Sequence, residues 1–105
     1  MSASLVYVTT ANADEAARIG GVLVTERLAA SVNILGEVRS IYSWEKEIHD
    51  KKETLLIAKT CTLRVDEIID RIRSLHSYQC PCIVAWRLDK GNNAYLNWVS
   101  QETTQ

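Results

Sequence analysis

The feature that most constrains the fold is a long run of strand-forming residues in the middle of the chain. Ala30–Leu35 is strand-like, Gly36 permits a bend or bulge, and the pattern continues with alternating residues over Val38–Glu47. A polar segment, His49–Lys52, predicts a turn, and Thr54–Cys61 returns as a nearly continuous strand pattern. We therefore expect one long, kinked β-hairpin, whose edges such a short chain leaves open to pairing with another chain.

Two helical patterns flank this hairpin. Asn12 stands three residues before Glu15, which is the spacing of a capping box, and an apolar stripe follows. Gly20 and Gly21 interrupt that helix and indicate close packing of its backbone against a sheet. The second helix, Val65–Leu75, is the clearest element, because its apolar residues recur at i, i+3, i+4 and i+7.

Strand patterns outside the helices complete the order of elements. Leu5–Thr9 predicts a strand buried on both faces, Cys80–Leu88 predicts a later strand, and Asn92 or Asn93 can cap a C-terminal helix. The order is β-α-β-β-α-β followed by α, which predicts an α+β, ferredoxin-like sandwich with an extra C-terminal helix. The length of 105 residues favours a single domain over residues 1–105.

Composition excludes several partners. The chain has 12 Lys and Arg against 13 Asp and Glu, a formal net charge of -1, so we expect no nucleic-acid binding. The apolar stretches fall short of the ~20 residues of a membrane span, and the first residues lack the basic segment of a targeting signal. Three cysteines are an odd number in a chain that needs no disulfide, so we expect reduced thiols and a cytoplasmic location.

The residues also argue against the usual chemistries of this fold. A soft-metal chaperone needs a Cys-x-x-Cys pair after the first strand, where this chain has Thr9–Asn12. An RNA-recognition domain needs stacking aromatic residues, whereas Leu55–Lys59 is aliphatic. The loop after the first strand has neither the Gly nor the Arg of an acylphosphatase, and no Ser-His-Asp set or metalloprotease helix is visible. The sequence therefore predicts a protein that is not an enzyme.

Six segments in a fixed order carry a resemblance to a known family. They are Val6–Thr10, Arg27–Asn33, Ser40–Glu45, Lys59–Thr60, Leu75–Tyr78 and Gly91–Trp98. Over nearly the whole chain they resemble the CutA divalent-cation tolerance family. The resemblance implies a homotrimer of ferredoxin-like subunits, in which the long hairpins join three sheets. It also implies a role in tolerance to copper and other divalent cations.

The chain departs from the family pattern at metal-ligand positions. The resemblance implies a thiol where this chain has Ser31, and in some members a metal-binding Cys and a second His where it has Thr9 and Leu75. Of that copper set only His76 remains. Metal binding would therefore need other ligands in this chain.

Cys80, Cys82 and His76 are the candidate metal ligands. The period of a strand places the two thiols on one face, about 6.6 Å apart, where they are either small buried hydrophobic side chains or ligands of a soft metal. Two thiolates do not complete a zinc site. His76 follows a helix, where its imidazole can act either as a helix cap or as a ligand. No cofactor is required, and copper or another divalent cation is the candidate ligand.

A second group mixes aromatic and charged side chains at the ends of elements, as pockets and interfaces do. Its members are Trp44, Glu45, Lys59, Tyr78, Tyr95 and Trp98. The resemblance implies that they converge on a cleft between subunits. Lys59 stands in an apolar strand and needs an anion, a carboxylate or an exposed edge.

Three functions follow from these residues. The first is a homotrimer that binds divalent cations without catalysis. The second is a signalling or ligand-sensing trimer that holds a small anionic molecule at Lys59 in an inter-subunit cleft. The third is a scaffold that only assembles with other proteins.

Overall fold

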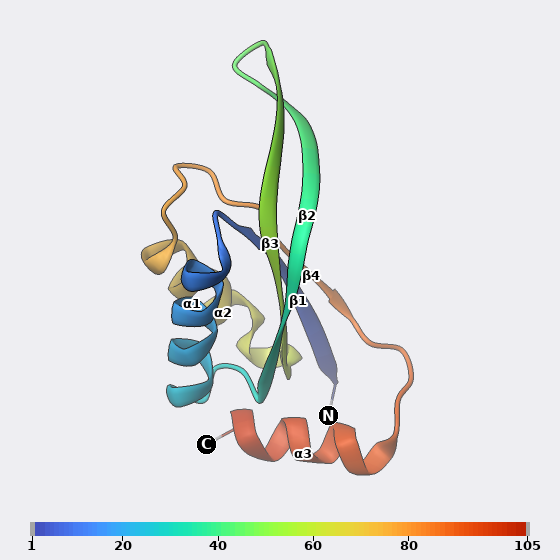
Figure 1. The fold of residues 1–105 in the computed structure, drawn as a ribbon. Coiled ribbons are helices and arrows are strands. Elements are labelled where there is room, and N and C mark those ends of the chain that lie inside the picture. The colour runs from blue at the N-terminus through green and yellow to red at the C-terminus, as the bar shows by residue number, and fades with distance from the viewer. Residues whose placement is uncertain (1, 105) are drawn as a thin grey trace.

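The computed structural model describes residues 2–104, which form a four-stranded antiparallel sheet and three α-helices (Figure 1). The elements are β1 (Ala3–Thr10), α1 (Ala13–Thr25), β2 (Ser31–Trp44), β3 (Glu47–Cys61), a 3₁₀ turn η1 (Thr62–Arg64), α2 (Val65–Leu75), β4 (Ile83–Arg87) and α3 (Asn93–Thr103). The sheet order is β2-β3-β1-β4, and every pair is antiparallel. The α+β, ferredoxin-like prediction is confirmed.

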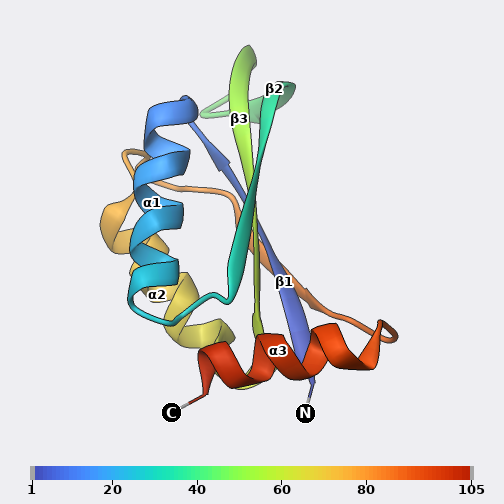
Figure 2. The same cartoon turned by 60° about the horizontal axis from the view of Figure 1, so that its bottom comes forward.

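Helices α1 and α2 pack together on one face of the sheet, and α3 crosses the end opposite the hairpin tip (Figures 1 and 2). The main core between helices and sheet is an apolar cluster built from alternate residues of the strands and one stripe of each helix. Its buried members are Val6, Val8, Ile19, Leu23, Leu28, Ala29, Leu56, Ala58, Ile68 and Ile72. α3 packs against the sheet through a smaller apolar cluster of Ala3, Ala30 and Val99.

The predicted capping box of α1 is present. Asn12 Oδ1 accepts a hydrogen bond from the Glu15 backbone N–H at 2.9 Å, and Glu15 Oε1 accepts one from the Ala11 N–H at 2.9 Å. The helix ends at Thr25, and Arg27 adopts the left-handed conformation with φ 61° just beyond it. Leu28 is therefore buried in the core from the following loop and not from the helix.

The hairpin is as long as expected, but its predicted turn is wrong. His49–Lys52 lie within β3, and the chain reverses at Glu45 and Lys46, which have φ of 50° and 67°. Two consecutive left-handed residues make the tight turn that suits a twisted hairpin. The sequence hides this turn because neither position is Gly, Asn or Asp, the residues that usually mark it. The predicted bulge does occur, between Leu35 and Glu37.

The strand predicted for Cys80–Leu88 is shorter than expected. β4 begins at Ile83, so Cys80, Pro81 and Cys82 form a loop that leads into an edge strand. Pro81 has no N–H to donate, and a residue before proline is restricted as well, so pairing with β1 starts only beyond them. Cys80 and Cys82 are exposed, so the prediction that they are small buried side chains is wrong. Cys61 is buried.

The middle of β1 is fully buried on only one face, contrary to the prediction. Val6 and Val8 face the helices and are fully buried, whereas Leu5 and Tyr7 on the other face are partly exposed. The neighbouring Trp86 on that face is 46% exposed. The helix layer thus covers one side of the sheet, and the other side carries apolar residues that remain open to solvent.

The two adjacent glycines of α1 offer a matched stability test. A Cβ at Gly20 would lie 2.9 Å from Val32 Cγ2, whereas a Cβ at Gly21 meets nothing within 4 Å. Alanine favours a helix by about 1 kcal/mol at either site, but crowding costs about 1–3 kcal/mol in a packed core. We expect Gly21→Ala to stabilise the protein and Gly20→Ala to be less stable than Gly21→Ala in denaturant unfolding. Equal stability of the two variants would contradict the close helix–sheet packing.

Candidate functional site

The main concave feature lies on the helix-free side of the sheet, beside the upper half of the hairpin. It encloses about 770 Å³, which is within the range of small-molecule pockets. Strands β1, β2 and β3 and the loop that follows α2 contribute its walls. The lining includes Tyr7, Thr9, Ser40, Tyr42, Trp44, His49, Lys51, Glu53, Tyr78, Cys80 and Cys82.

The bulge at Gly36 determines which side chains of β2 face this pocket. Before the bulge, Leu35 pairs with Leu55, and both lie on the helix-free face. After it, Glu37 pairs with Thr54 on the helix side, and the even-numbered residues of β2 then pair with odd-numbered residues of β3. Because one extra residue reverses the alternation, Tyr42 and Trp44 point to the pocket side.

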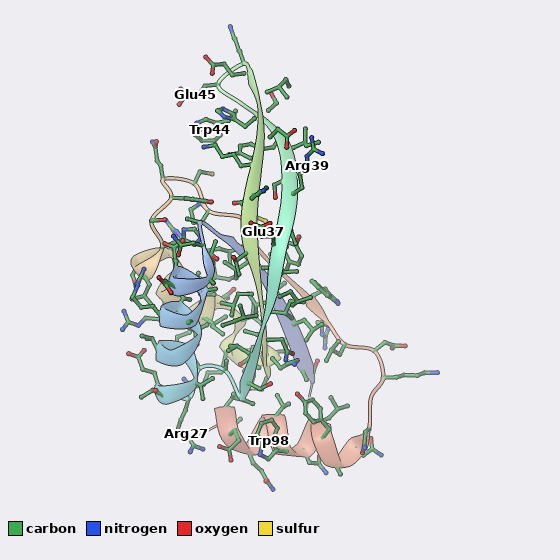
Figure 3. The ribbon with its side chains drawn as sticks, viewed as in Figure 1. Arg27, Glu37, Arg39, Trp44, Glu45 and Trp98 are labelled. Carbon is green, nitrogen blue, oxygen red and sulfur yellow. The ribbon has the colours of Figure 1, made fainter. Side chains whose placement is uncertain are left out.

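Aromatic side chains of the hairpin follow one another along the helix-free face towards the tip. Tyr42 pairs with His49, and their rings stack with centroids 5.2 Å apart and an interplanar angle of 18°. Trp44 and Glu45 lie near the hairpin tip (Figure 3). His49, expected as a solvated turn residue, is therefore a partly buried member of the pocket wall.

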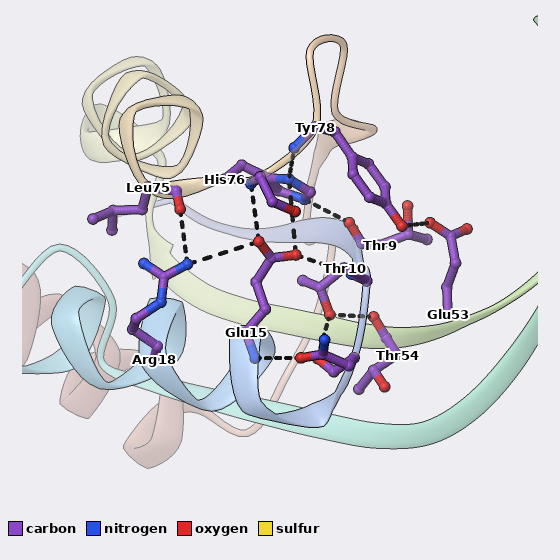
Figure 4. Close-up of polar contacts among 12 residues, drawn as sticks. Thr9, Thr10, Glu15, Arg18, Glu53, Thr54, Leu75, His76 and Tyr78 are labelled. Carbon is purple, nitrogen blue, oxygen red and sulfur yellow. Dashed lines mark hydrogen bonds and ion pairs between the residues drawn. The ribbon is translucent and has the colours of Figure 1, made fainter.

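A buried polar cluster fixes the loop that forms the other wall (Figure 4). The Glu15 carboxylate accepts hydrogen bonds from the backbone N–H groups of Ala11 and Ser77, both at 2.9 Å. Burial alone would raise the pKa of Glu15, but these hydrogen bonds lower it below its usual value. The start of α1 is thereby joined to the end of α2.

His76 acts in this cluster through both ring nitrogens. Its side chain is fully buried, Nδ1 accepts a hydrogen bond from the Tyr78 N–H at 3.1 Å, and Nε2 lies 2.8 Å from the Thr9 carbonyl oxygen. The neutral ring with its proton on Nε2 satisfies both contacts. The ring therefore joins β1 to the loop after α2, and it does so in place of the predicted helix cap, since its hydrogen bonds go to Thr9 and Tyr78.

Tyr78 continues the cluster into the pocket. Its hydroxyl donates a 2.7 Å hydrogen bond to Glu53 Oε2, across the gap between the loop and β3. Burial, followed by this hydrogen bond and the Glu53 charge, raises the pKa of Tyr78. The phenol therefore stays protonated and keeps the loop attached to the sheet.

The predicted metal ligands do not gather into one site. Cys80 and Cys82 line the pocket, whereas His76 is buried and hydrogen-bonded behind it. Within residues 2–104, no three His, Cys, Asp or Glu side chains are placed to hold a metal ion together. Burial, and then the charge of Glu53, raises the pKa of the Cys82 thiol.

The six predicted cleft residues divide between two ends of the subunit. Trp44 and Tyr78 line the pocket, and Glu45 occupies the hairpin turn. Tyr95 and Trp98 lie at the opposite end, on α3, with their rings tilted by 39° and the centroids 5.7 Å apart. Figure 3 shows Trp98 at that end. One chain therefore does not bring the six together.

Lys59 lies at the α3 end, near Tyr95. It pairs across the sheet with Ser31, whose hydroxyl is 3.3 Å from the Tyr95 hydroxyl. Its ammonium group donates a hydrogen bond to Asn33 Oδ1 and is only partly buried. The hydrogen-bond partner of the Lys59 ammonium is thus the neutral side-chain amide of Asn33.

Sequence reasoning missed Glu53, Lys51 and Tyr42 as pocket residues. Their shared face depends on the position of the turn and on the bulge, and the misplaced turn assigned Lys51 to a loop. A signal was present in the alternation of His49, Lys51 and Glu53, which places three polar side chains on one strand face. That signal becomes readable only when the segment is recognised as a strand.

Known proteins resemble this chain over almost its entire length. The family of the CutA1 divalent ion tolerance protein matches residues 4–102. The chain belongs to the CutA divalent-cation tolerance family. The divalent-cation tolerance protein CutA of Thermus thermophilus is 39% identical over 99 residues, which cover 94% of this chain and 96% of that protein. Protein CutA of Homo sapiens is 37% identical over 102 residues, which cover 97% of this chain but 57% of the human protein.

Solved CutA structures have the same fold. The divalent cation tolerance protein from Thermus thermophilus superposes with a TM-score of 0.94 at 38% identity, over 97% of this chain and 99% of that one. CutA1 from Oryza sativa superposes with a TM-score of 0.96 at 33% identity, over 100% and 96%. The family is named for cation tolerance and not for a reaction. None of the helices in residues 2–104 is long and apolar enough to cross a membrane.

The Glu15 cluster predicts a pH-dependent stability. In Glu15→Gln an amide NH₂ replaces one acceptor oxygen, so a buried N–H loses its partner, and we expect a loss of about 1–3 kcal/mol at pH 7. Since the folded pKa of Glu15 is depressed, its charge stabilises the fold above the ordinary value of 4.5, and this contribution disappears as the pH falls through the folded pKa.

Denaturant unfolding at pH 7 and at about pH 3 measures this effect. The difference between Glu15→Gln and the unaltered protein should shrink at the lower pH. Glu45→Gln, in the exposed hairpin turn, is the matched control and should change little at either pH. A deficit of Glu15→Gln that is equally large at both pH values would contradict the role given to the Glu15 charge.

Proposed function

We propose that this CutA-family chain assembles as a homotrimer and binds copper or another divalent cation in the course of a metal response, without catalysing a reaction. The observation that carries the metal part is the position of Cys80 and Cys82. Both thiols are free and exposed, and both line the same pocket. Soft thiolate ligands favour copper in its reduced state over hard cations.

The thiol pair compensates for the ligands that the chain lacks. Thr9 and Ser31 stand where the family resemblance led us to expect thiols, and the His76 ring nitrogens already have hydrogen-bond partners. Cys80 and Cys82 are held next to the Tyr78 anchor, so their loop has a defined position beside the sheet. Other ligands of the ion would come from water, or from a neighbouring subunit of the trimer.

The helix-free side of the sheet supports the homotrimer. Leu35, Val84 and Trp86 on that side are 43%, 52% and 46% exposed. An apolar surface of this kind marks an interface with another protein, and closed symmetry around copies of one chain is the usual way to bury it. In a trimer, the hairpin end of one subunit can lie beside the α3 end of another, which would bring the six cleft residues together.

A ligand-sensing trimer is the second candidate. Lys59 is partly exposed and pairs with Ser31, whose hydroxyl contacts that of Tyr95, and these groups suit a small anionic molecule at a subunit boundary. For either function we propose a reducing compartment such as the cytoplasm, because free, exposed thiols persist there.

Titration with Cu(I) under anaerobic conditions tests the metal site. We expect the unaltered protein to compete with a chromogenic Cu(I) chelator and the double variant Cys80→Ser, Cys82→Ser to lose at least tenfold in affinity, because hydroxyl groups are poor ligands for a soft ion. The control variant Cys61→Ala removes a buried thiol outside the pocket and should retain copper binding. Unchanged affinity in the double variant would contradict the assignment of the thiol pair.

A further inference from the structure

Glu53 is a buried carboxylate that faces a cavity. The residue is only 6% exposed, yet it lines the pocket beside the hairpin. Its Oε2 accepts the hydrogen bond from Tyr78, whereas Oε1 has no hydrogen-bond partner in residues 2–104. No fully enclosed side-chain oxygen or nitrogen in those residues lacks a partner, so Oε1 keeps some open surface, and that surface belongs to the pocket. A desolvated carboxylate of this kind favours a positively charged partner.

Aromatic side chains line the same pocket as this carboxylate. Tyr7, Tyr42, Trp44 and Tyr78 all line the same pocket. The faces of such rings attract cations and pack well against apolar or planar groups. The combination of a carboxylate with several rings is therefore suited to an organic cation.

The positive charges at the pocket do not neutralise Glu53. Arg39 makes two hydrogen bonds to Asp50, at 2.8 and 2.6 Å, so its charge is already paired. Lys51 lies two residues from Glu53 on the same strand face, but no ion pair joins them within residues 2–104. Lys51 is exposed, at the outer side of a pocket whose inner side carries the buried carboxylate.

We propose that this pocket binds a small organic molecule that carries an ammonium group beside an aromatic or apolar body. The ammonium contacts Glu53 Oε1, and the body packs against Tyr42 and Trp44. Amines and amino acids share this chemistry. An amino acid would in addition place its carboxylate near the Lys51 ammonium.

The groups around Glu53 favour a cationic ligand over an anionic one. The only hydrogen-bond partner of the Glu53 carboxylate in residues 2–104 is the neutral Tyr78 hydroxyl, which brings no compensating charge. A small anion in the same place would lie against an unneutralised carboxylate. The proposal does not rest on metal binding or on the anion site at Lys59, which lies towards the α3 end.

Calorimetric titration with three related indoles tests the proposal, on the full-length protein in metal-free buffer with a chelator. Tryptamine carries the ammonium alone, L-tryptophan carries both charges, and indole-3-propionate carries the carboxylate alone. We expect tryptamine and L-tryptophan to bind and indole-3-propionate to bind at least tenfold more weakly than tryptamine. Tighter binding of L-tryptophan than of tryptamine would identify an amino acid as the ligand, and the reverse order an amine.

Variants locate the site. Glu53→Gln should weaken tryptamine about tenfold or more, because it removes the charge while its amide oxygen can still accept from Tyr78. Glu47→Gln, on the same face of the same strand but outside the pocket, is the control and should leave affinity unchanged. If Glu53→Gln does not fold, Trp44→Leu, at an exposed position, tests the site instead. We expect it to weaken the affinity for tryptamine about two- to thirtyfold.

Three results would overturn the proposal. The first is that none of the indoles binds. The second is that indole-3-propionate binds as tightly as tryptamine. The third is that folded Glu53→Gln, or Trp44→Leu in its place, retains full affinity for tryptamine. Because no metal is present, each of these results leaves the copper titration to be judged separately.

Discussion

The rest of the structure depends on a sheet that the helices cover on one face. Two helices pack on that face of the four strands and the third helix crosses one end, so within residues 2–104 most of the other face is left without a covering layer (Figures 1 and 2). Isolated sheets with an open apolar face are poorly stable, and the usual solution is a second layer. We propose that other copies of the chain supply this second layer, and the pocket lies on that same side.

Two local features shape the pocket: a β-bulge in β2 and a cluster of hydrogen bonds around Glu15. A one-residue bulge at Gly36 reverses the alternation of β2 and directs Tyr42 and Trp44 to the helix-free side. On the opposite wall, the buried Glu15 carboxylate holds the loop after α2 by the Ser77 backbone, and Tyr78 spans from that loop to Glu53. The site is thus positioned by a strand register on one side and by a hydrogen-bonded cluster on the other.

The sequence was informative where periodicity is long and the relevant contacts are local. The stripe of α2, the capping box at Asn12 and the order of strands and helices were all predictable, since each depends on residues a few positions apart. The family resemblance was also readable, because its segments occur in order along the chain.

The site was much less predictable, for physical reasons. The turn at Glu45 and Lys46 has none of the residues that mark left-handed conformations, so the register of the upper hairpin was lost, and with it the pocket face of Lys51 and Glu53. The burial of His76 depends on Thr9, which is distant in the sequence, and the exposure of Cys80 depends on where β4 begins. None of these contacts leaves a local pattern.

The molar mass in solution tests the central claim most directly, because it reports whether copies of the chain cover the open face. Light scattering on the unaltered protein should give about three times the 11.8 kDa mass of one chain at micromolar concentration. Trp86→Glu places a charge on the helix-free face and should shift the mass towards that of one chain, whereas Leu63→Glu, at a residue 83% exposed outside the sheet, should leave the trimer intact. A monomeric unaltered protein, or a Trp86→Glu variant that remains fully trimeric, would contradict the account.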